Sequence, residues 1–286
     1  MGSDGSLSTF FPAKILLFGE YTVINGGVAL AIPFDHFQGS WHLSQAPRYD
    51  WNPLLRFLQA HPELAIDAAR LERDLAGGAG YVSTIPQGKG LGSSGALVAS
   101  IFDYYSLQKD LSLLEVKHKL SQMEGFYHGQ SSGVDPLVSW LKKPLLLDAQ
   151  FNPQVAELPV ERWRELERWF LFDSEVSRHS APLIAAFKQK MQDESFKITM
   201  GHLNLVIDEA IDAYQEINEA VMGQVMLDLS RLQFECLQEM IPQAMKQLWL
   251  EGLDSRQFAL KLCGAGGGGY FIGYRLKNAP TKTLKF

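Results

Sequence analysis

The sequence predicts an α+β protein built from two domains, and three observations lead to this prediction. Short runs rich in β-branched and aromatic residues, the pattern of strands, occur in both halves of the chain. Longer runs with apolar residues three and four apart indicate helices. Glycine-rich stretches stand in both halves, and long helices dominate after about residue 160. We therefore expect domains at 7–160 and 161–286, with the active site in the cleft between them.

Length and composition narrow the classes of function. The chain has 286 residues, of which 46% are hydrophobic and 20% charged, the composition of a globular protein. A net charge of −6 provides no electrostatic footprint for nucleic acid or for an anionic membrane. A phosphate site must therefore be local, made from backbone amides, one or two cations and a metal. Cys236 and Cys263 form no disulfide framework, and no apolar run could span a membrane, which predicts a cytoplasmic protein.

The first expected element is a strand over residues 11–18, which forms a hairpin-like unit with a second strand over 28–33. Lys14 stands among the apolar residues of the first strand, where an ammonium is costly unless it has an anionic partner. A lysine that reaches out from the strand edge is the alternative. Further strands are expected at 40–44, 80–85, 145–148, 169–173, 259–263 and 270–274, and helices at 53–59, 96–102, 112–127, 137–141, 180–191, 200–219 and 222–250.

Residues 86–96 read PQGKGLGSSGA, a glycine-rich loop between a predicted strand and a predicted buried helix. Glycines let the backbone approach a ligand closely, and the free N–H groups of a helix start attract anions. Ser93 or Ser94 can cap this helix, and a hydroxyl there can reach a phosphate or its Mg²⁺. The stretch is neither a Walker A loop nor a dinucleotide fingerprint, so a plain glycine turn capped by serine is the alternative.

Two acidic residues follow at places that admit more than one role. Ser112 and Glu115 form a capping box that begins the helix over 112–127. Glu124 lies near the end of this helix, where the dipole disfavours negative charge unless a cation such as a metal is near. A solvated surface glutamate is the alternative. Asp135 follows a glycine turn and begins another apolar run, so it is either a helix cap or a functional carboxylate.

A second glycine-rich stretch, GAGGGG at residues 264–269, separates the last two predicted strands. Five glycines in six positions cost backbone entropy, so we expect this loop to pass very close to a ligand or to another loop. A flexible hairpin is the alternative.

Together these stretches resemble the three signature motifs of the galactokinase, homoserine kinase, mevalonate kinase and phosphomevalonate kinase superfamily, the GHMP kinases. The motifs are residues 12–27, 86–94 and 264–269, in the family's order and spacing. The run from Glu124 to Asp135 is most similar to mevalonate kinases, as is the stretch 173–180. The departures are Tyr21 for the usual histidine, which is more like phosphomevalonate kinases, Gly95 for the usual alanine, and Cys263 for the usual threonine.

The resemblance implies a GHMP kinase fold, with an N-terminal domain like ribosomal protein S5 and a C-terminal ferredoxin-like α/β domain. It implies ATP-dependent phosphorylation of the primary hydroxyl of mevalonate. Asp135 would accept the hydroxyl proton or orient the hydroxyl, and Lys14 would keep that carboxylate ionised. Mg²⁺ would be held by Glu124 and by Ser94, or Ser93 in its place. The resemblance places ATP at Gly88, Lys89, Gly90, Leu91, Gly92, Ser93, Ser94 and Gly95, and the substrate at Glu20, Tyr21, Arg178, Ser180, Gly266 and Gly267.

Two other functions stay open. One is a superfamily kinase for phosphomevalonate or another small alcohol. The other is a sensor that binds ATP and a metabolite without transferring phosphate, although the presence of Lys14, Glu124 and Asp135 argues against it. The expected partners are ATP and a small alcohol, with no nucleic acid and no membrane. Whether the chain is a monomer or a homodimer stays open.

Overall fold

The structure, a computed structural model, describes residues 9–43, 49–177, 180–277, 280 and 283–285. The chain forms two compact units. Unit 1 comprises the described residues of 1–14, 33–87 and 91–143, and unit 2 those of 15–32, 88–90 and 144–286. Strands β1 (Phe11–Phe18) and β2 (Ala29–Leu43) therefore contribute residues to both units. The sequence domains at 7–160 and 161–286 stay a prediction.

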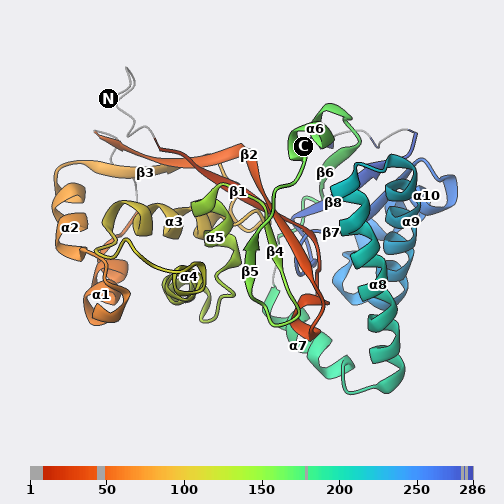
Figure 1. Ribbon diagram of the computed structural model, residues 1–286, viewed down its shortest axis with the longest axis horizontal. Helices are drawn as coiled ribbons and strands as arrows, with labels where there is room; N and C mark the ends of the chain where they lie inside the picture. The colour runs from red at the N-terminus through yellow and green to blue at the C-terminus, as the bar shows by residue number, and fades with distance from the viewer. Residues whose placement is uncertain (1–8, 44–48, 178–179, 278–279, 281–282, 286) are drawn as a thin grey trace. The chain divides into compact units, whose positions relative to one another are not determined.

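Unit 1 combines the second part of β2 with helices. Strand β3 (Ala79–Ser83) pairs antiparallel with β2, from Gly39 opposite Ser83 to Leu43 opposite Ala79. The Trp41 indole donates a hydrogen bond to Ser100 at 3.1 Å and so joins β2 to helix α3 (Ser93–Tyr105). Helix α3 packs against α4 (Leu113–His128) and α5 (Val134–Leu141), which also pack against each other (Figure 1). The helices of the unit are α1 (Asn52–Ala60), α2 (Ala68–Ala76), α3 (Ser93–Tyr105), α4 (Leu113–His128) and α5 (Val134–Leu141), with a 3-10 turn η2 at Pro62–Leu64.

Local signals fix the start of α4 but not that of α3. The capping box of Ser112 and Glu115 is formed, as the sequence predicts. Helix α3 begins after Gly92, whose backbone is left-handed at φ 74°, and within the described chain no side chain caps it. The expectation that Ser93 or Ser94 caps this helix is therefore wrong, because the Ser94 hydroxyl is turned to other partners described below.

Unit 2 contains two antiparallel arrangements of strands. In the first, the order is β1-β2-β4-β5, with β4 (Leu145–Leu147) and β5 (Pro153–Val155). In the second, the order is β7-β8-β6-β9, formed by β6 (Trp169–Asp173), β7 (Phe258–Leu262), β8 (Tyr270–Arg275) and β9 (Thr283–Lys285). The helices are α6 (Val160–Glu165), α7 (Ser180–Lys190), α8 (Glu194–Glu216), α9 (Glu219–Cys236) and α10 (Gln243–Ser255), with short turns η1 (Val23–Asn25) and η3 (Gln238–Met240).

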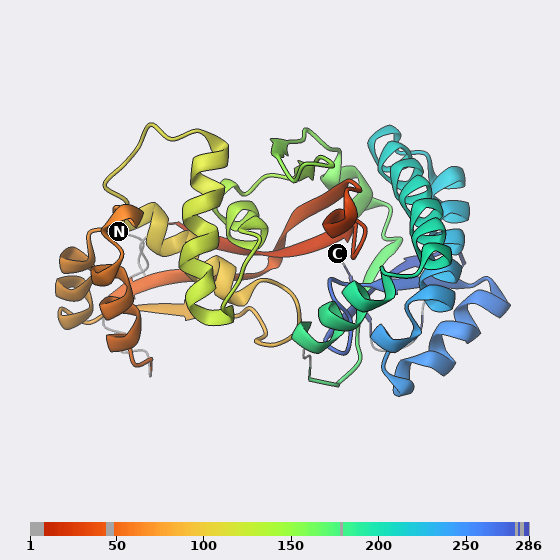
Figure 2. The same cartoon turned by 90° about the horizontal axis from the view of Figure 1, so that it is seen from below.

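Helices α8 and α9 run side by side, and α9 and α10 pack on β7 (Figure 2). The single helix predicted over 222–250 is wrong, because α9 ends at Cys236 and α10 starts at Gln243. Pro242 stands immediately before α10, where its missing N–H costs nothing, whereas inside a helix it would break one hydrogen bond. Among the helices that the structure describes, none has the length and apolar character needed to cross a membrane.

Candidate active site

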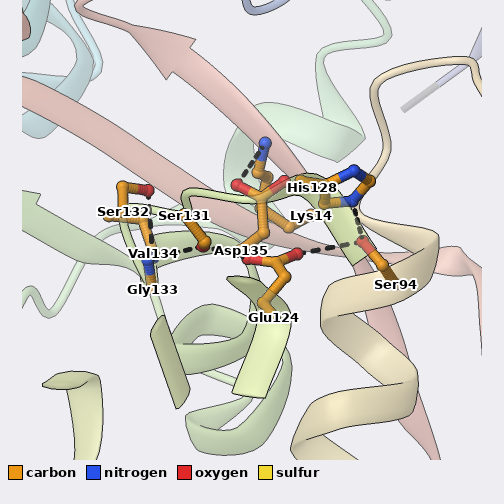
Figure 3. Close-up of polar contacts among 9 residues, drawn as sticks. All are labelled: Lys14, Ser94, Glu124, His128, Ser131, Ser132, Gly133, Val134 and Asp135. Atoms are coloured by element: carbon orange, nitrogen blue, oxygen red, sulfur yellow. Dashed lines mark hydrogen bonds and ion pairs between the residues drawn. The ribbon is translucent and has the colours of Figure 1, made fainter. Parts of the chain in front are cut away.

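An ion pair between Lys14 and Asp135 forms the centre of the site (Figure 3). The Lys14 ammonium lies 2.7 Å from Asp135 Oδ1, and the lysine is 6% exposed. Lys14 therefore has the anionic partner that its apolar surroundings demand, and the alternative of a lysine at the strand edge is wrong. Asp135 is the second residue of α5, and within the described residues its side chain does not cap that helix, which begins after Gly133. The interpretation of Asp135 as a cap is also wrong.

Glu124 points into the same cluster from the last turn of α4 (Figure 3). Only 4% of this residue is exposed, so the alternative of a solvated surface glutamate is wrong. Ser94 donates to Glu124 Oε1 at 3.0 Å, and Ser131 donates to Oε2. Burial raises the pKa of the Glu124 carboxyl to about 7, and the negative charge of Asp135 adds to this rise.

Sequence reasoning missed two members of this cluster, His128 and Ser131. The His128 ring nitrogen Nε2 lies 2.9 Å from the Ser94 oxygen. A serine hydroxyl has one proton, so while Ser94 donates to Glu124 the His128 nitrogen must act as the donor. The spacing of four residues between Glu124 and His128 on one helix could have signalled this proximity. Ser131 lies in a loop whose course no local pattern predicts.

The anion loop, residues 86–95, has the open backbone that its glycines predict. Gly88, Gly90 and Gly92 all have positive φ angles, at 69°, 85° and 74°. Lys89 lies between them and forms an ion pair of 2.6 Å with Asp173 at the end of β6. The Lys89 carbonyl also accepts a hydrogen bond from the Tyr270 amide at 3.3 Å. The loop tip at 88–90 is thus held by its side chain and its backbone within unit 2.

The glycine loop at 264–269 packs closely against three other segments, so the alternative of a flexible hairpin is wrong. A Cβ at Gly268 would lie 2.6 Å from the Val176 carbonyl oxygen. A Cβ at Gly269 would lie 2.6 Å from the Lys89 carbonyl oxygen. A Cβ at Gly266 would clash with the Met240 carbonyl oxygen. The Gly267 amide donates a hydrogen bond to the same oxygen at 2.7 Å. Other loops therefore occupy the space that the missing side chains leave free.

The substrate residues expected from the resemblance lie in unit 2 as far as they are described. Glu20 forms an ion pair with Lys261, and both side chains are completely buried. Burial raises the pKa of Glu20, and Lys261 opposes this rise. Glu20 thus joins the first motif to β7. The Tyr21 hydroxyl donates to the Ala265 carbonyl at 2.7 Å and joins the first motif to the third. Arg178 lies outside the described residues, and Ser180 begins α7 with a side chain that is not described.

Comparison with known families finds a match in the N-terminal half of the chain. Residues 63–143, which contain the anion loop, Glu124 and Asp135, match the sequence model of the GHMP kinases N terminal domain. This part of the chain is therefore similar to the N-terminal domain of GHMP kinases. No curated protein matches this chain in a comparison of sequences.

Solved structures show the same fold over nearly the whole chain. A mevalonate kinase from Methanococcus jannaschii has a TM-score of 0.69 at 18% identity, with 97% of this chain and 92% of that chain covered. A mevalonate kinase from L. major, solved with R-mevalonate, has a TM-score of 0.65 at 18% identity, covering 96% and 90%. A phosphomevalonate kinase from Streptococcus pneumoniae has a TM-score of 0.65 at 16% identity, covering 95% and 92%. The α+β GHMP kinase fold is confirmed.

The cluster around Glu124 fits a magnesium ion by its donor chemistry. Mg²⁺ prefers oxygen ligands, keeps several waters, and is commonly bound by one or two carboxylates together with phosphates. Glu124 supplies a carboxylate and Ser94 a hydroxyl oxygen, and the two groups already touch. In the described cluster the carboxylates of Glu124 and Asp135 share one ammonium, that of Lys14. A divalent cation would offset this excess of negative charge and hold Glu124 ionised.

We expect Glu124→Gln to keep the fold while weakening the Mg²⁺ dependence of turnover. The amide still accepts a hydrogen bond from Ser94, but it removes the charge that attracts the cation. Titration of the rate with Mg²⁺ measures the effect, with Glu115→Gln in the exposed capping box as the matched variant. If the parent and Glu124→Gln have the same Mg²⁺ activation constant, Glu124 is not a ligand of the metal.

The same substitution should change how stability depends on pH. The pKa of Glu124 in the folded protein, about 7, lies above its ordinary value of 4.5. Between these values the folded protein binds a proton that the unfolded chain has lost, so the stability that this proton confers disappears as the pH rises. Urea unfolding in EDTA should show stability of the parent falling by on the order of 1–3 kcal/mol from pH 4.5 to 7. Glu124→Gln should lack this contribution, and equal slopes would contradict the prediction.

Proposed function

We propose that this chain is an ATP-dependent kinase that phosphorylates the primary hydroxyl of mevalonate, a step toward isoprenoid precursors. The observation that carries the proposal is the pairing of Lys14 with Asp135 directly beside the Glu124–Ser94 pair. Phosphoryl transfer depends mainly on positioning and on neutralising charge, and this cluster offers a carboxylate, an ammonium and magnesium ligands together.

The start of α3 is suited to the phosphates of ATP. Its first-turn N–H groups are left without a side-chain cap among the described residues, and the preceding loop exposes its backbone through left-handed glycines. Free N–H groups and the helix dipole together favour an anion at this end. The thirteen-residue helix is buried over most of its length, which holds this end in place. The amides of Ser93, Ser94 and Gly95 would contact the phosphates.

An aromatic surface beside the anion loop would receive the nucleotide base. The Gln87 amide donates to the Tyr49 hydroxyl at 2.8 Å, and Tyr49 is 47% exposed. Trp51 lies next to Tyr49 and stacks on the buried Trp41. Flat, partly exposed rings offer a face on which a purine can stack. Sequence reasoning missed Tyr49, because nothing in its neighbourhood distinguishes it from other surface aromatic residues.

Asp135 and Lys14 would act on the alcohol. The Asp135 carboxylate can accept the proton of the attacking hydroxyl or hold that hydroxyl in line, as a general base must do from hydrogen-bond distance. The Lys14 ammonium would neutralise charge that develops as the hydroxyl attacks. Glu124 and Ser94 would hold Mg²⁺, which would neutralise negative charge on the phosphates.

Mevalonate is proposed because the run from Glu124 to Asp135 is similar to that of mevalonate kinases, and one similar structure holds R-mevalonate. Tyr21 is the residue that favours phosphomevalonate instead, but its hydroxyl is bonded to Ala265. Structures of both kinases have the same TM-score of 0.65, so the likeness of fold does not separate the two substrates.

A coupled assay of ADP release with mevalonate, phosphomevalonate, homoserine and galactose tests the proposal. We expect the largest kcat/KM with mevalonate. A larger kcat/KM with another alcohol would show that mevalonate is not the preferred substrate, but it would still support kinase activity. If the protein binds ATP but releases no ADP with any of the four alcohols, the result would favour the sensor.

A further inference from the structure

Gly95, the third residue of α3, faces the start of α5 with no room for a side chain. A Cβ built on Gly95 would lie 2.8 Å from the Pro136 nitrogen and 2.9 Å from both the carbonyl carbon and the Cβ of Asp135. Separations under 3.0 Å are essentially never seen for real Cβ atoms. Two of the three opposing atoms belong to the backbone, so no side chain can rotate to make room. The start of α5 is therefore placed directly on the backbone of α3.

A hydrogen bond from the second half of α5 holds this helix against β1. Ser139, which is 1% exposed, donates its hydroxyl proton to the Pro12 carbonyl at 2.8 Å. The Lys14 amide donates to the Leu91 carbonyl at 3.0 Å and joins β1 to the anion loop. The start of α3, helix α5 and the first residues of β1 thus form a closed frame within unit 1. A shift of α5 away from α3 would move Asp135 relative to Lys14.

We propose that Gly95 is a positioning residue, whose missing side chain lets α5 approach α3 closely enough to place the Asp135 carboxylate against Lys14. The inference rests on the proposed function, in which Asp135 acts on the alcohol.

The test compares Gly95→Ala with Gly201→Ala, a change in α8 where an added Cβ meets nothing within 4 Å. Alanine normally stabilises a helix relative to glycine, so Gly201→Ala should raise the melting temperature and leave turnover unchanged. Gly95→Ala should lower the melting temperature and reduce kcat by roughly 10²-fold, the cost typical of a 1 Å misplacement. The dissociation constant of AMP-PNP, measured by calorimetry, should change by less than about threefold, because the free amides of the helix start remain.

A double variant shows whether Gly95 acts through Asp135. If it does, adding Gly95→Ala to Asp135→Asn should slow the enzyme by no more than about twofold, because the group it positions is already disabled. A purely structural defect would reduce kcat by the same factor in both backgrounds, and this outcome would overturn the proposal. An unchanged kcat in Gly95→Ala alone would also overturn it.

Two further measurements separate this inference from the proposed function. If the parent phosphorylates none of the alcohols, a crystal structure of Gly95→Ala still shows whether the 2.7 Å contact of Lys14 with Asp135 has opened. An unaltered contact would overturn the inference. If Gly95→Ala does not fold, Ser139→Ala takes its place, because it removes the hydrogen bond that holds α5 to Pro12 of β1. Its kcat should fall by roughly tenfold while AMP-PNP binding is retained. An unchanged kcat would show that the contact of α5 with β1 does not position Asp135.

Discussion

Asp135→Asn is expected to yield a folded protein that binds nucleotide and turns over roughly 10²–10⁴-fold more slowly than the parent. Asparagine has the same shape as aspartate and can still accept a hydrogen bond from Lys14, but it cannot take up the proton of an alcohol. Stability should fall by only about 1–2 kcal/mol, since the aspartate side chain is 31% exposed and the contact is partly kept. Steady-state kinetics, calorimetry with AMP-PNP and urea unfolding measure the three quantities.

Asp110→Asn, in an exposed loop, provides the matched control and should match the parent in rate. Lys14→Met should slow turnover as well, because it removes the cation from the same pair. If Asp135→Asn phosphorylates the alcohol at a near-normal rate, the aspartate has no place in the mechanism.

Lys261→Met should have the largest effect on stability, a loss of about 3–5 kcal/mol. The ammonium of Lys261 and the carboxylate of Glu20 are both completely buried, and Lys261 also donates to the Leu262 carbonyl at 2.7 Å. Removing the ammonium leaves Glu20 without its counter-charge in an apolar interior, so the carboxyl must take up a proton or draw in water. Urea unfolding at pH 7 measures the loss.

The double variant Glu20→Gln/Lys261→Met should regain much of this stability, because the charge that was left unpaired is gone as well. Lys188→Met on the exposed face of α7 is the control, with an expected change within about 0.5 kcal/mol. A loss below about 1 kcal/mol in Lys261→Met would show that this pair does not hold the first motif to β7.

Local sequence signals were sufficient where a structure depends on neighbours in the chain. The buried helix α3 followed from an apolar run without glycine or proline after residue 95, and the start of α4 followed from its capping box. Strands β6, β7 and β8 followed from short apolar runs flanked by turn residues. The break between α9 and α10 was missed although Pro242 marks it, because the apolar pattern continues on both sides.

For the candidate site, the sequence by itself determined which chemical groups are present: Lys14 in an apolar strand, Glu124 at a helix end, and glycine loops in both halves. Only the tertiary structure decided which of these groups meet. It paired Lys14 with Asp135, gave Glu124 two hydroxyl donors, and buried Glu20 against Lys261. The physical reason is that a side chain's partner and its desolvation depend on residues far away in the chain, whereas propensity and capping act over a few residues.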